Sequence, residues 1–430
     1  MADVIDELRD WLSDNWDPDL TCAQWWERLG LAGWSQPIMP SHRYGRGLSR
    51  GDAIKVQRAI LEHGALGAPN GLGLMLAAPT IAQHGTDEQV ERFVRPIVTG
   101  QLAWCQLFSE PGAGSDLAGL TTKAIKDGDE WIINGQKVWT SGGQIADMGM
   151  LIARTNPTAP KHQGITWFAF DMHQPGVEVR PLKEMTGHAM FNEVFMSDAV
   201  VGDDARIGDV NDGWSVANTT LLFERSGMGA GGDRVMGAPP GTIAGNLDKR
   251  AGDFVRKPST KPKAKAAAPG ERTSPAAGYI TLAREFGKAD EPSMRQRLAQ
   301  SHILSELARL NTERHKAVRA AGGDIPGLAN FSKLLMADIL RHNRDMSGDI
   351  MGARGMLHGY TDDQRKSLAG VPGGSAATSM TGAILGAQAL PIYGGTDQIQ
   401  KNMVGERALG LPKEPGDQSR LPFNELPKNG

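Results

Sequence analysis

Apolar residues recur every three to four positions through the first hundred residues of the chain. The pattern runs through DVIDELRDWLSDNW (3–16), SRGDAIKVQRAILEHGA (49–65) and LGLMLAAPTIAQHGTDEQVERFVRPIVTG (72–100), with Gly and Pro between these segments. Apolar side chains at this spacing share one face of a helix. The pattern therefore predicts an N-terminal helical domain over residues 1–102.

Short β-type runs replace the helical period from Ala103 onward. Turn-forming Gly, Asn, Asp and Pro separate the runs, which is typical of strands joined by turns. Asn134-Gly135 lies between two alternating halves and predicts a hairpin turn at that point. A middle β domain is therefore predicted over residues 103–208, with its strands in EWIINGQKVWT (130–140), MGMLIART (148–155), GITWFAFDM (164–172) and VEVRPL (177–182).

The helical period returns after Asp209. It runs through the long segments 211–229, 294–320 and 330–356, which predicts a C-terminal helical bundle over residues 209–430. Residues 246–278 interrupt it, because they are rich in Lys, Pro and Ala and poor in large apolar side chains. This composition predicts a disordered or loosely held insertion.

Composition and charge narrow the class of protein. A chain of 430 residues exceeds the size at which one hydrophobic core stops growing, so two or three domains are expected. A net charge of −3 and a pI near 6.4 give no reason to expect a nucleic-acid partner. Two cysteines without metal-ligand spacing, no apolar run of about 18 residues and no secretory signal predict a cytoplasmic protein without a membrane span or a metal site.

One acidic residue, Glu224, falls on an apolar stripe of the helical segment 211–229. In a helix it shares a face with Ala217, Leu221 and Met228. A carboxylate on such a face costs free energy unless it is paired, protonated or used chemically. Two interpretations remain open at this point: an acid paired with Arg225 or another partner, or an acid that takes part in a reaction.

Two turns are candidate ligand contacts. In LFSEPGAGSD (107–116), the glycines let backbone N–H groups approach a planar or phosphorylated ligand, and the serines supply hydroxyls. In KVWTSGG (137–143), Trp139 stands beside two hydroxyls, an arrangement that suits an aromatic cofactor, although tryptophan is also a common core residue. Neither turn is a Walker A loop or a G-x-G-x-x-G loop after a strand.

In combination, the motifs resemble the acyl-CoA dehydrogenase family in their order and spacing. They are SEPGAGSD, WIINGQKVWTSGG, NDGW at a helix start, and IYGGTDQIQKNMVGERALGLP near the C-terminus. The resemblance implies an α+β fold with an N-terminal helical domain, a middle β-barrel-like domain and a C-terminal four-helix bundle. It also implies FAD held between the subunits of a homodimer, homotetramer or heteromer, and oxidation of an acyl-CoA thioester to the trans-2-enoyl-CoA, with an electron-transferring flavoprotein as electron acceptor.

The resemblance also assigns individual site residues. It implies that Ser115, Arg225, Gly394 and Gly395 contact the acyl-CoA, with the N–H of Gly394 or Gly395 at the thioester oxygen. The implied FAD contacts are Gln106, Phe108, Ser109, Gly114, Ser115, Trp139, Thr140, Ser141, Arg295, Asp349, Gly352, Ala353, Thr396, Asp397 and Gln398.

The chain departs from the commonest family pattern at the catalytic acid. Many members carry a glutamate directly after the tyrosine of IYEGT, whereas this chain has Gly394 at that position. Members such as the isovaleryl-CoA and long-chain acyl-CoA dehydrogenases instead place the acid on a bundle helix in a Glu-Arg dipeptide, which LLFERSG resembles. The resemblance thus implies that Glu224 is the general base that removes the α-proton.

The sequence leaves several functional alternatives open. Related pairs of chains divide flavin contacts and base between them, so a half-active or non-catalytic subunit of a heteromer is one alternative. An acyl-CoA oxidase or nitroalkane oxidase of the same fold is another. Gly227, Gly229 and Gly231 after the base leave room for a bulky or branched acyl group, a sterol side chain included.

Overall fold

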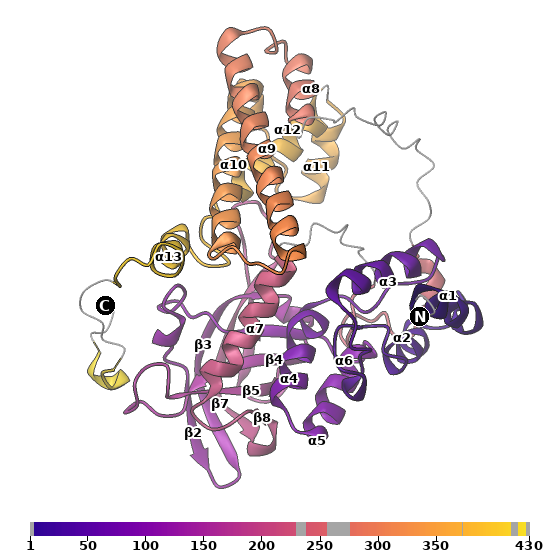
Figure 1. Cartoon of the computed structure of the whole chain (residues 1–430), viewed down its shortest axis with the longest axis vertical. Coiled ribbons are helices and arrows are strands. Elements are labelled where there is room, and N and C mark those ends of the chain that lie inside the picture. The colour runs from indigo at the N-terminus through magenta and orange to yellow at the C-terminus, as the bar shows by residue number, and fades with distance from the viewer. Residues whose placement is uncertain (1–3, 229–237, 256–275, 372, 414–419, 427–430) are drawn as a thin grey trace. The chain divides into compact units, whose positions relative to one another are not determined.

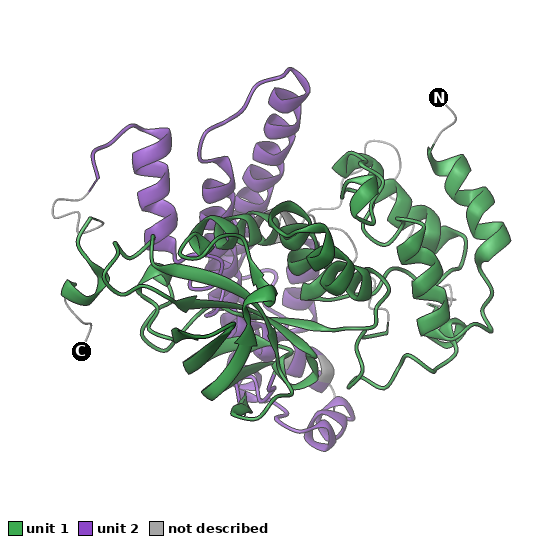
Figure 2. Ribbon diagram, turned by 90° about the horizontal axis from the view of Figure 1, so that it is seen from below, with its two compact units in different colours: residues 1–182, 190–258, 418–430 green, residues 183–189, 259–417 purple. Residues whose placement is uncertain are grey.

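The computed structural model of the chain describes residues 4–228, 238–255, 276–371, 373–413 and 420–426, with only the backbone described at 225–228, 375 and 377 (Figure 1). The chain divides into two compact units (Figure 2). Unit 1 contains residues 1–182, 190–258 and 418–430, and unit 2 contains residues 183–189 and 259–417. Each unit is described by itself below.

The N-terminal helices of unit 1 are built around buried tryptophans. Helices α1 (Val4–Asn15), α2 (Cys22–Leu31) and α3 (Arg50–Glu62) enclose Trp25 and Trp26. Their indole N–H groups donate to the carbonyls of Leu66 (2.6 Å) and Gly67 (3.0 Å), so burying these rings leaves no indole donor unsatisfied. The helical pattern of the first hundred residues is confirmed here.

The predicted loose insertion at 246–278 is wrong for residues 246–255. The backbone N–H groups of Cys22 and Ala23 donate to the carbonyls of Lys249 (2.8 Å) and Leu247 (2.9 Å), and Ala251 is fully buried in the tryptophan core. The average composition of the segment hid the few apolar residues that pack there. Residues 256–275 lie outside the described part of the chain, and 277–278 begin helix α8 (Ala277–Glu285).

The remaining helices of the N-terminal part of unit 1 precede the sheet along the chain. A π-helical turn (Gly73–Ala77) continues as α4 (Ala78–His84), followed by α5 (Asp87–Gln89), a second π-helical turn (Val90–Val94) and α6 (Arg95–Val98). Residues from both π-helical turns, α4 and α6 pack into the same hydrophobic core as the sheet.

An eight-stranded sheet forms the middle of unit 1 (Figure 1). Its strand order is β6-β7-β3-β2-β4-β5-β8, with β1 pairing in parallel with β4. The four predicted strand runs are confirmed as β3, β4, β5 and β6. The strands are β1 (Trp104–Leu107), β2 (Lys123–Asp127), β3 (Glu130–Ser141), β4 (Met148–Arg154), β5 (Ile165–Asp171), β6 (Val177–Leu182), β7 (Phe191–Gly202) and β8 (Arg206–Ile207).

The predicted hairpin turn at Asn134-Gly135 is wrong, because β3 runs straight through it. Asn134 donates to the Asp198 carboxylate (2.9 Å) and accepts from the Asp198 N–H (3.0 Å), which holds the dipeptide against β7. A Cβ at Gly135 would lie 2.4 Å from Thr122 Oγ1, so the glycine permits close passage past the neighbouring segment. Pairing on both sides of β3 outweighs the local turn preference, and the β2–β3 turn is made by residues 128–129 instead.

Helix α7 (Gly213–Met228) lies over the sheet of unit 1 (Figure 1). It contacts β5, α4 and the π-helical turn at Gly73–Ala77, and Val216 and Ala217 are fully buried in the main core. The helix therefore presents Ala217 of the predicted stripe to the body of unit 1, with Leu221 partly buried against the same core, while the side chain of Met228 lies outside the described part of the structure.

Unit 2 is helical apart from its loops. It contains α8, α9 (Pro292–Ala320), α10 (Leu328–Met351), α11 (Asp362–Ala369), α12 (Gly374–Gly386) and α13 (Asp397–Met403). Helix α10 packs against α8, α9, α12 and α13. The mixed α+β class predicted from the sequence is confirmed, with helical parts before and after a β sheet.

A half-buried histidine joins α4 to α7. His84 Nε2 lies 2.8 Å from Thr219 Oγ1, and burial lowers the pKa of His84 below its ordinary value of 6.5 despite the opposing charge of Asp212. Because the folded-state pKa is depressed, protonation favours the unfolded chain. The stabilisation is complete above the unfolded pKa and is lost as the pH falls through the folded one.

We therefore expect the free energy of unfolding to fall between pH 7.5 and pH 5.5, as measured by urea titration at each pH. The variant His84→Gln, which keeps a hydrogen-bonding side chain but does not titrate, should lose less stability over this interval. An identical pH dependence in parent and variant would rule out His84 as the source.

Candidate active site

The glycine-rich turn after β1 presents an open surface. Its backbone closes on itself, since the N–H of Glu110 donates to Ala113 O (3.0 Å) and the N–H of Ala113 to Glu110 O (3.1 Å). A Cβ at Gly112 or Gly114 would meet no atom within 4 Å, and Ser115 is exposed. The turn can therefore accept a ligand against its backbone, in the way the sequence predicts for Gly114 and Ser115.

Trp139 is held in an unusual backbone conformation at the surface. Its side chain is 61 % exposed and its φ is +61°, in the left-handed region that bulky residues rarely adopt. The register between β3 and β7 shifts between Lys137 and Thr140, so Trp139 lies in a β-bulge. Strained, exposed aromatic residues of this kind occur at ligand sites, and a planar ligand would cover the exposed ring.

The two residues that follow the tryptophan differ in accessibility. Thr140 is fully buried, whereas Ser141 is exposed. Of the two predicted hydroxyl contacts, only Ser141 presents its hydroxyl at the surface. Phe108 likewise lies in the core, 4 % exposed, and its carbonyl accepts from Lys137 Nζ (3.0 Å), so a ligand contact by its side chain is not available in this conformation.

Glu224 lies beside the end of β1. Gln106 Nε2 donates to Glu224 Oε2 over 3.4 Å, and both side chains are half-buried. Leu221 and Phe223 pack against the main core next to the acid. The structure thus brings the candidate base together with Gln106, the first of the predicted flavin contacts. The side chain of Arg225 and residues 229–231 lie outside the described part of the structure.

The other predicted residues belong to unit 2. Arg295 is exposed in the first turn of α9. Asp349 forms an ion pair with Arg297, which ties the last turn of α10 to α9. Gly352 ends α10 with a φ of +54°, and Ala353 follows it at the surface. The structure therefore places Asp349 on a helix and leaves Gly352 and Ala353 in the turn that follows.

The glycine pair at 394–395 is a left-handed turn before α13. Gly394 and Gly395 have φ values of +64° and +84°, and the buried Gln400 donates from Nε2 to Gly394 O (2.8 Å). Thr396 caps α13, because its Oγ1 accepts from the N–H of Ile399 (3.2 Å). This turn fixes the direction of the backbone at both predicted substrate contacts.

Asp397 is committed to contacts within unit 2. Its carboxylate accepts from Lys333 Nζ (2.9 Å) and forms an ion pair with Arg341, both on α10. Burial raises the pKa of Asp397, but the two cations outweigh it and hold the pKa below its usual value. The side chain therefore anchors α13, while Gln398 beside it remains exposed.

Sequence reasoning missed the buried ion pair of Lys137 and Glu110. Lys137 is fully buried, and its Nζ lies 2.9 Å from Glu110 Oε1. The alternation along β3 contained the signal, because Lys137 has the same parity as the buried Trp131 and Ile133. A lysine at an inward position needs an anionic partner.

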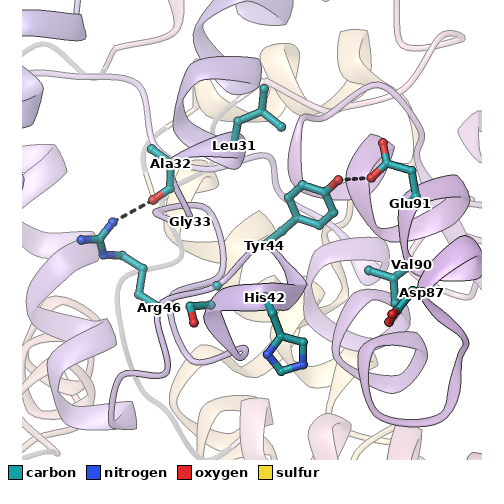
Figure 3. A pocket seen from close by; sticks show the side chains of 11 residues that line it. Leu31, Ala32, Gly33, His42, Tyr44, Arg46, Asp87, Val90 and Glu91 are labelled. Atoms are coloured by element: carbon teal, nitrogen blue, oxygen red, sulfur yellow. Dashed lines mark hydrogen bonds between the residues drawn. The ribbon is translucent and has the colours of Figure 1, made fainter.

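A cavity of about 690 Å³ lies among the N-terminal helices and holds none of the predicted site residues (Figure 3). Its polar groups bond to one another, since Tyr44 Oη donates to Glu91, Arg46 donates to Ala32 O (2.9 Å), and Asp87 pairs with Arg43 (2.7 Å). Nothing in this arrangement points to chemistry.

Three family models match the chain in order. They are the N-terminal (residues 2–101), middle (105–199) and C-terminal (273–409) domains of acyl-CoA dehydrogenase. The chain belongs to the acyl-CoA dehydrogenase family, and it is an oxidoreductase of that family.

Individual relatives agree with this assignment. The chain is 31 % identical to the acyl-CoA dehydrogenase IpdE1 of Mycobacterium tuberculosis, over 95 % of this chain and 97 % of the relative. It is 36 % identical to the acyl-CoA dehydrogenase FadE34 of the same organism over 86 % of this chain, but it spans only 44 % of that longer protein. A solved structure described as the Tcur3481-Tcur3483 steroid ACAD has the same fold, with a TM-score of 0.67, 23 % identity, and coverage of 96 % of this chain and 97 % of that chain.

No helix within the described residues is both long and apolar enough to cross a membrane.

Proposed function

We propose that this chain is an FAD-dependent acyl-CoA dehydrogenase that converts an acyl-CoA thioester to the trans-2-enoyl-CoA, with Glu224 as the general base. The observation that carries the proposal is the position of Glu224 beside Gln106, in the unit that also holds the Trp139 surface and the open turn at Gly112–Ser115. The acyl-CoA dehydrogenase family uses FAD in general, and the exposed ring and open turn fit an isoalloxazine.

The proposed reaction requires two kinds of group from the protein, a base and a hydrogen-bond donor. A base must lie within hydrogen-bond reach of the α-proton, in surroundings that exclude water. Glu224 is half-buried, so a bound acyl group would have to complete the exclusion of water, and the amide of Gln106 orients its carboxylate. A donor must also face the thioester oxygen as negative charge develops there, and we assign this role to a backbone N–H of the Gly394-Gly395 turn. FAD, when bound, supplies the acceptor for the hydride from the β-carbon.

We extend the proposal to the substrate class and the electron acceptor. A bulky or branched acyl group, such as a fatty acid or sterol side chain, is supported by the run of glycines after Glu224, all in or beyond the last turn of α7. The structurally similar Tcur3481-Tcur3483 protein is a steroid ACAD, which agrees with this class. An electron-transferring flavoprotein is the proposed acceptor, and the cytoplasm the proposed location.

The surface of unit 2 supports an oligomer. Ile303, Leu307 and Leu310 follow one another at helical spacing on α9 and are each about half exposed. A stripe of large apolar side chains on a helix surface is typical of an interface between subunits. We therefore propose a homodimer or homotetramer, or a heteromer with a related chain, in which Arg295, Asp349, Gly352, Ala353, Thr396, Asp397 and Gln398 contribute to FAD binding.

The test is purification followed by an assay of acyl-CoA oxidation. We expect a yellow protein with one FAD per chain, a size above that of a monomer, and reduction of an artificial electron acceptor with at least one member of a panel of straight, branched and sterol acyl-CoA substrates. Leu307→Glu should lower the oligomeric state in analytical ultracentrifugation, whereas Ile54→Glu, on the exposed side of α3, should not.

Other outcomes of this test separate the alternatives. A colourless protein that takes up no added FAD would refute the proposal. A yellow protein that becomes active only when a related chain is added would be one subunit of a heteromer. Rapid formation of hydrogen peroxide by the reduced enzyme would identify an oxidase.

A further inference from the structure

Two groups that the proposed reaction does not use lie directly behind the proposed flavin surface. Lys137 Nζ donates to Glu110 Oε1 (2.9 Å) and to Phe108 O (3.0 Å), and both side chains are buried. The other acceptor positions of Glu110 are filled by the N–H (2.7 Å) and hydroxyl (2.8 Å) of Thr121 and by the N–H of Thr122 (2.9 Å). Every described contact of the pair therefore lies within the protein.

The pair connects the two surfaces assigned to the flavin. Glu110 begins the open turn that contains Gly114 and Ser115, and Lys137 is the last residue in register with β7 before the bulge that carries Trp139. The N–H of Val138 also donates to Ser109 O (2.9 Å). Gly112 and Gly114 of the turn face open space, although Ala113 between them is buried in the main core, and the exposed Trp139 ring meets Phe191 nearly at a right angle with 5.9 Å between ring centroids.

Stabilisation of the fold alone does not account for the buried ion pair of Lys137 and Glu110. Removing two charges from water costs free energy that their mutual attraction repays only in part, and neutral replacements of buried ion pairs are often as stable as the originals. Here the charges of Glu110 and Lys137 are retained at the one place where the turn meets the bulge. Fixed, multiply bonded groups are suited to holding two segments at a set separation.

We propose that Lys137 and Glu110 are a positioning pair that fixes the spacing between the Trp139 bulge and the Ser109–Ser115 turn and thereby preorganises the FAD site. The inference rests on the proposed function, because it concerns the same flavin surface. Neither residue touches the ligand in this proposal. Both act through Trp139 and the backbone of the turn.

The electrostatics keep Glu110 ionised, while burial lowers the pKa of Lys137 against the opposing effect of the Glu110 charge. Burial raises the pKa of Glu110, but Lys137 and the hydrogen bonds from Thr121 and Thr122 outweigh it and bring the pKa to about 2. The charge of Glu110 also raises the pKa of the nearby Arg154, although burial outweighs it and brings that pKa to about 10. The carboxylate therefore stays ionised at any pH at which the enzyme is assayed.

The test compares FAD affinity with folding stability in a neutralised pair. Lys137→Met alone leaves a buried carboxylate without its cation and is expected to fold poorly, so the informative variant is Lys137→Met/Glu110→Gln, which keeps the size of both side chains and a carbonyl acceptor for one of the two threonine N–H groups. Its apoprotein should unfold at a urea concentration equal to or above that of the parent. FAD titration should show a dissociation constant raised about tenfold or more, since a loosened segment must be ordered on binding.

A matched control is the exposed ion pair of Glu178 and Arg180 on β6 of the same sheet, with 2.7 Å between the charged atoms. Glu178→Gln/Arg180→Met should leave both stability and FAD affinity unchanged. The visible circular dichroism of bound flavin supplies a further readout, which we expect to change only in the Lys137→Met/Glu110→Gln variant.

The outcomes distinguish this inference from the proposed function. If the parent binds no FAD, the proposed function fails. If the parent binds FAD and the neutralised pair binds it within twofold of the parent with the same dichroism, the positioning role is refuted. A loss of affinity that appears only together with a matching loss of folding stability would equally refute it and leave the pair a structural one.

Discussion

Glu224→Gln is expected to lower the rate of acyl-CoA oxidation by 10²-fold or more while FAD content and fold stay intact. Glutamine keeps the size of the side chain and an oxygen that accepts from Gln106, which donates over 3.4 Å in the parent, but it does not accept the α-proton. Loss of a general base typically costs 10² to 10⁴ in rate. The measurement is steady-state turnover with an artificial acceptor, together with the flavin spectrum and the dissociation constant of the acyl-CoA.

The control for this prediction is Glu62→Gln, which makes the same substitution at an exposed acid at the end of α3 and should leave turnover unchanged. Equal effects on turnover and on acyl-CoA binding would indicate that Glu224 serves binding rather than proton removal. Turnover of the Glu224→Gln variant at the parent rate would show that the base lies elsewhere and that Glu224 is a paired structural acid.

Trp139→Gly is expected to weaken FAD binding strongly while hardly changing the stability of the apoprotein. The side chain is 61 % exposed, so little packing is lost on removing it. Its φ of +61° is strained for tryptophan and ordinary for glycine, a relief of roughly 1 kcal/mol that offsets the flexibility that glycine adds to the unfolded chain. Loss of aromatic stacking on a planar ring typically costs about 1–3 kcal/mol, which corresponds to about 5- to 150-fold in affinity.

Fluorescence titration of FAD into the apoprotein measures the affinity, and urea unfolding of the same apoprotein measures the stability. Trp139→Phe, which keeps a flat ring at the same bulge, should give an intermediate affinity. Unchanged FAD affinity in Trp139→Gly would contradict the flavin surface. A large loss of stability in that variant would show instead that the indole is part of the packing.

Most helices and strands of this fold follow from sequence patterns among neighbouring residues. Apolar spacing alone located the helices of the first hundred residues and the strands β3 to β6, because a period of three to four residues or of two fixes which side chains share a face. The same reasoning failed at Asn134-Gly135, where the turn preference of a dipeptide is weaker than pairing with strands on both sides.

The candidate site shows the same difference between what local sequence patterns indicate and what distant residues decide. Motif order in the sequence was enough to indicate the family and to propose roles for Glu224 and Trp139. Whether each hydroxyl or carboxylate is accessible depends on contacts with residues that are far away in the sequence. Asp397 is held by Lys333 and Arg341, on a helix more than 50 residues earlier.

The sequence by itself determined the order of helical and β segments and the family, and it supplied the candidate site residues. Tertiary structure alone decided that residues 246–255 pack beneath the first helices, that Ser141 faces outward while Thr140 faces the core, and that the buried Lys137 reaches Glu110. The physical reason is the range of the forces involved. Periodicity is set between neighbours in the chain, whereas burial and ion pairing depend on segments that meet only when the chain has folded.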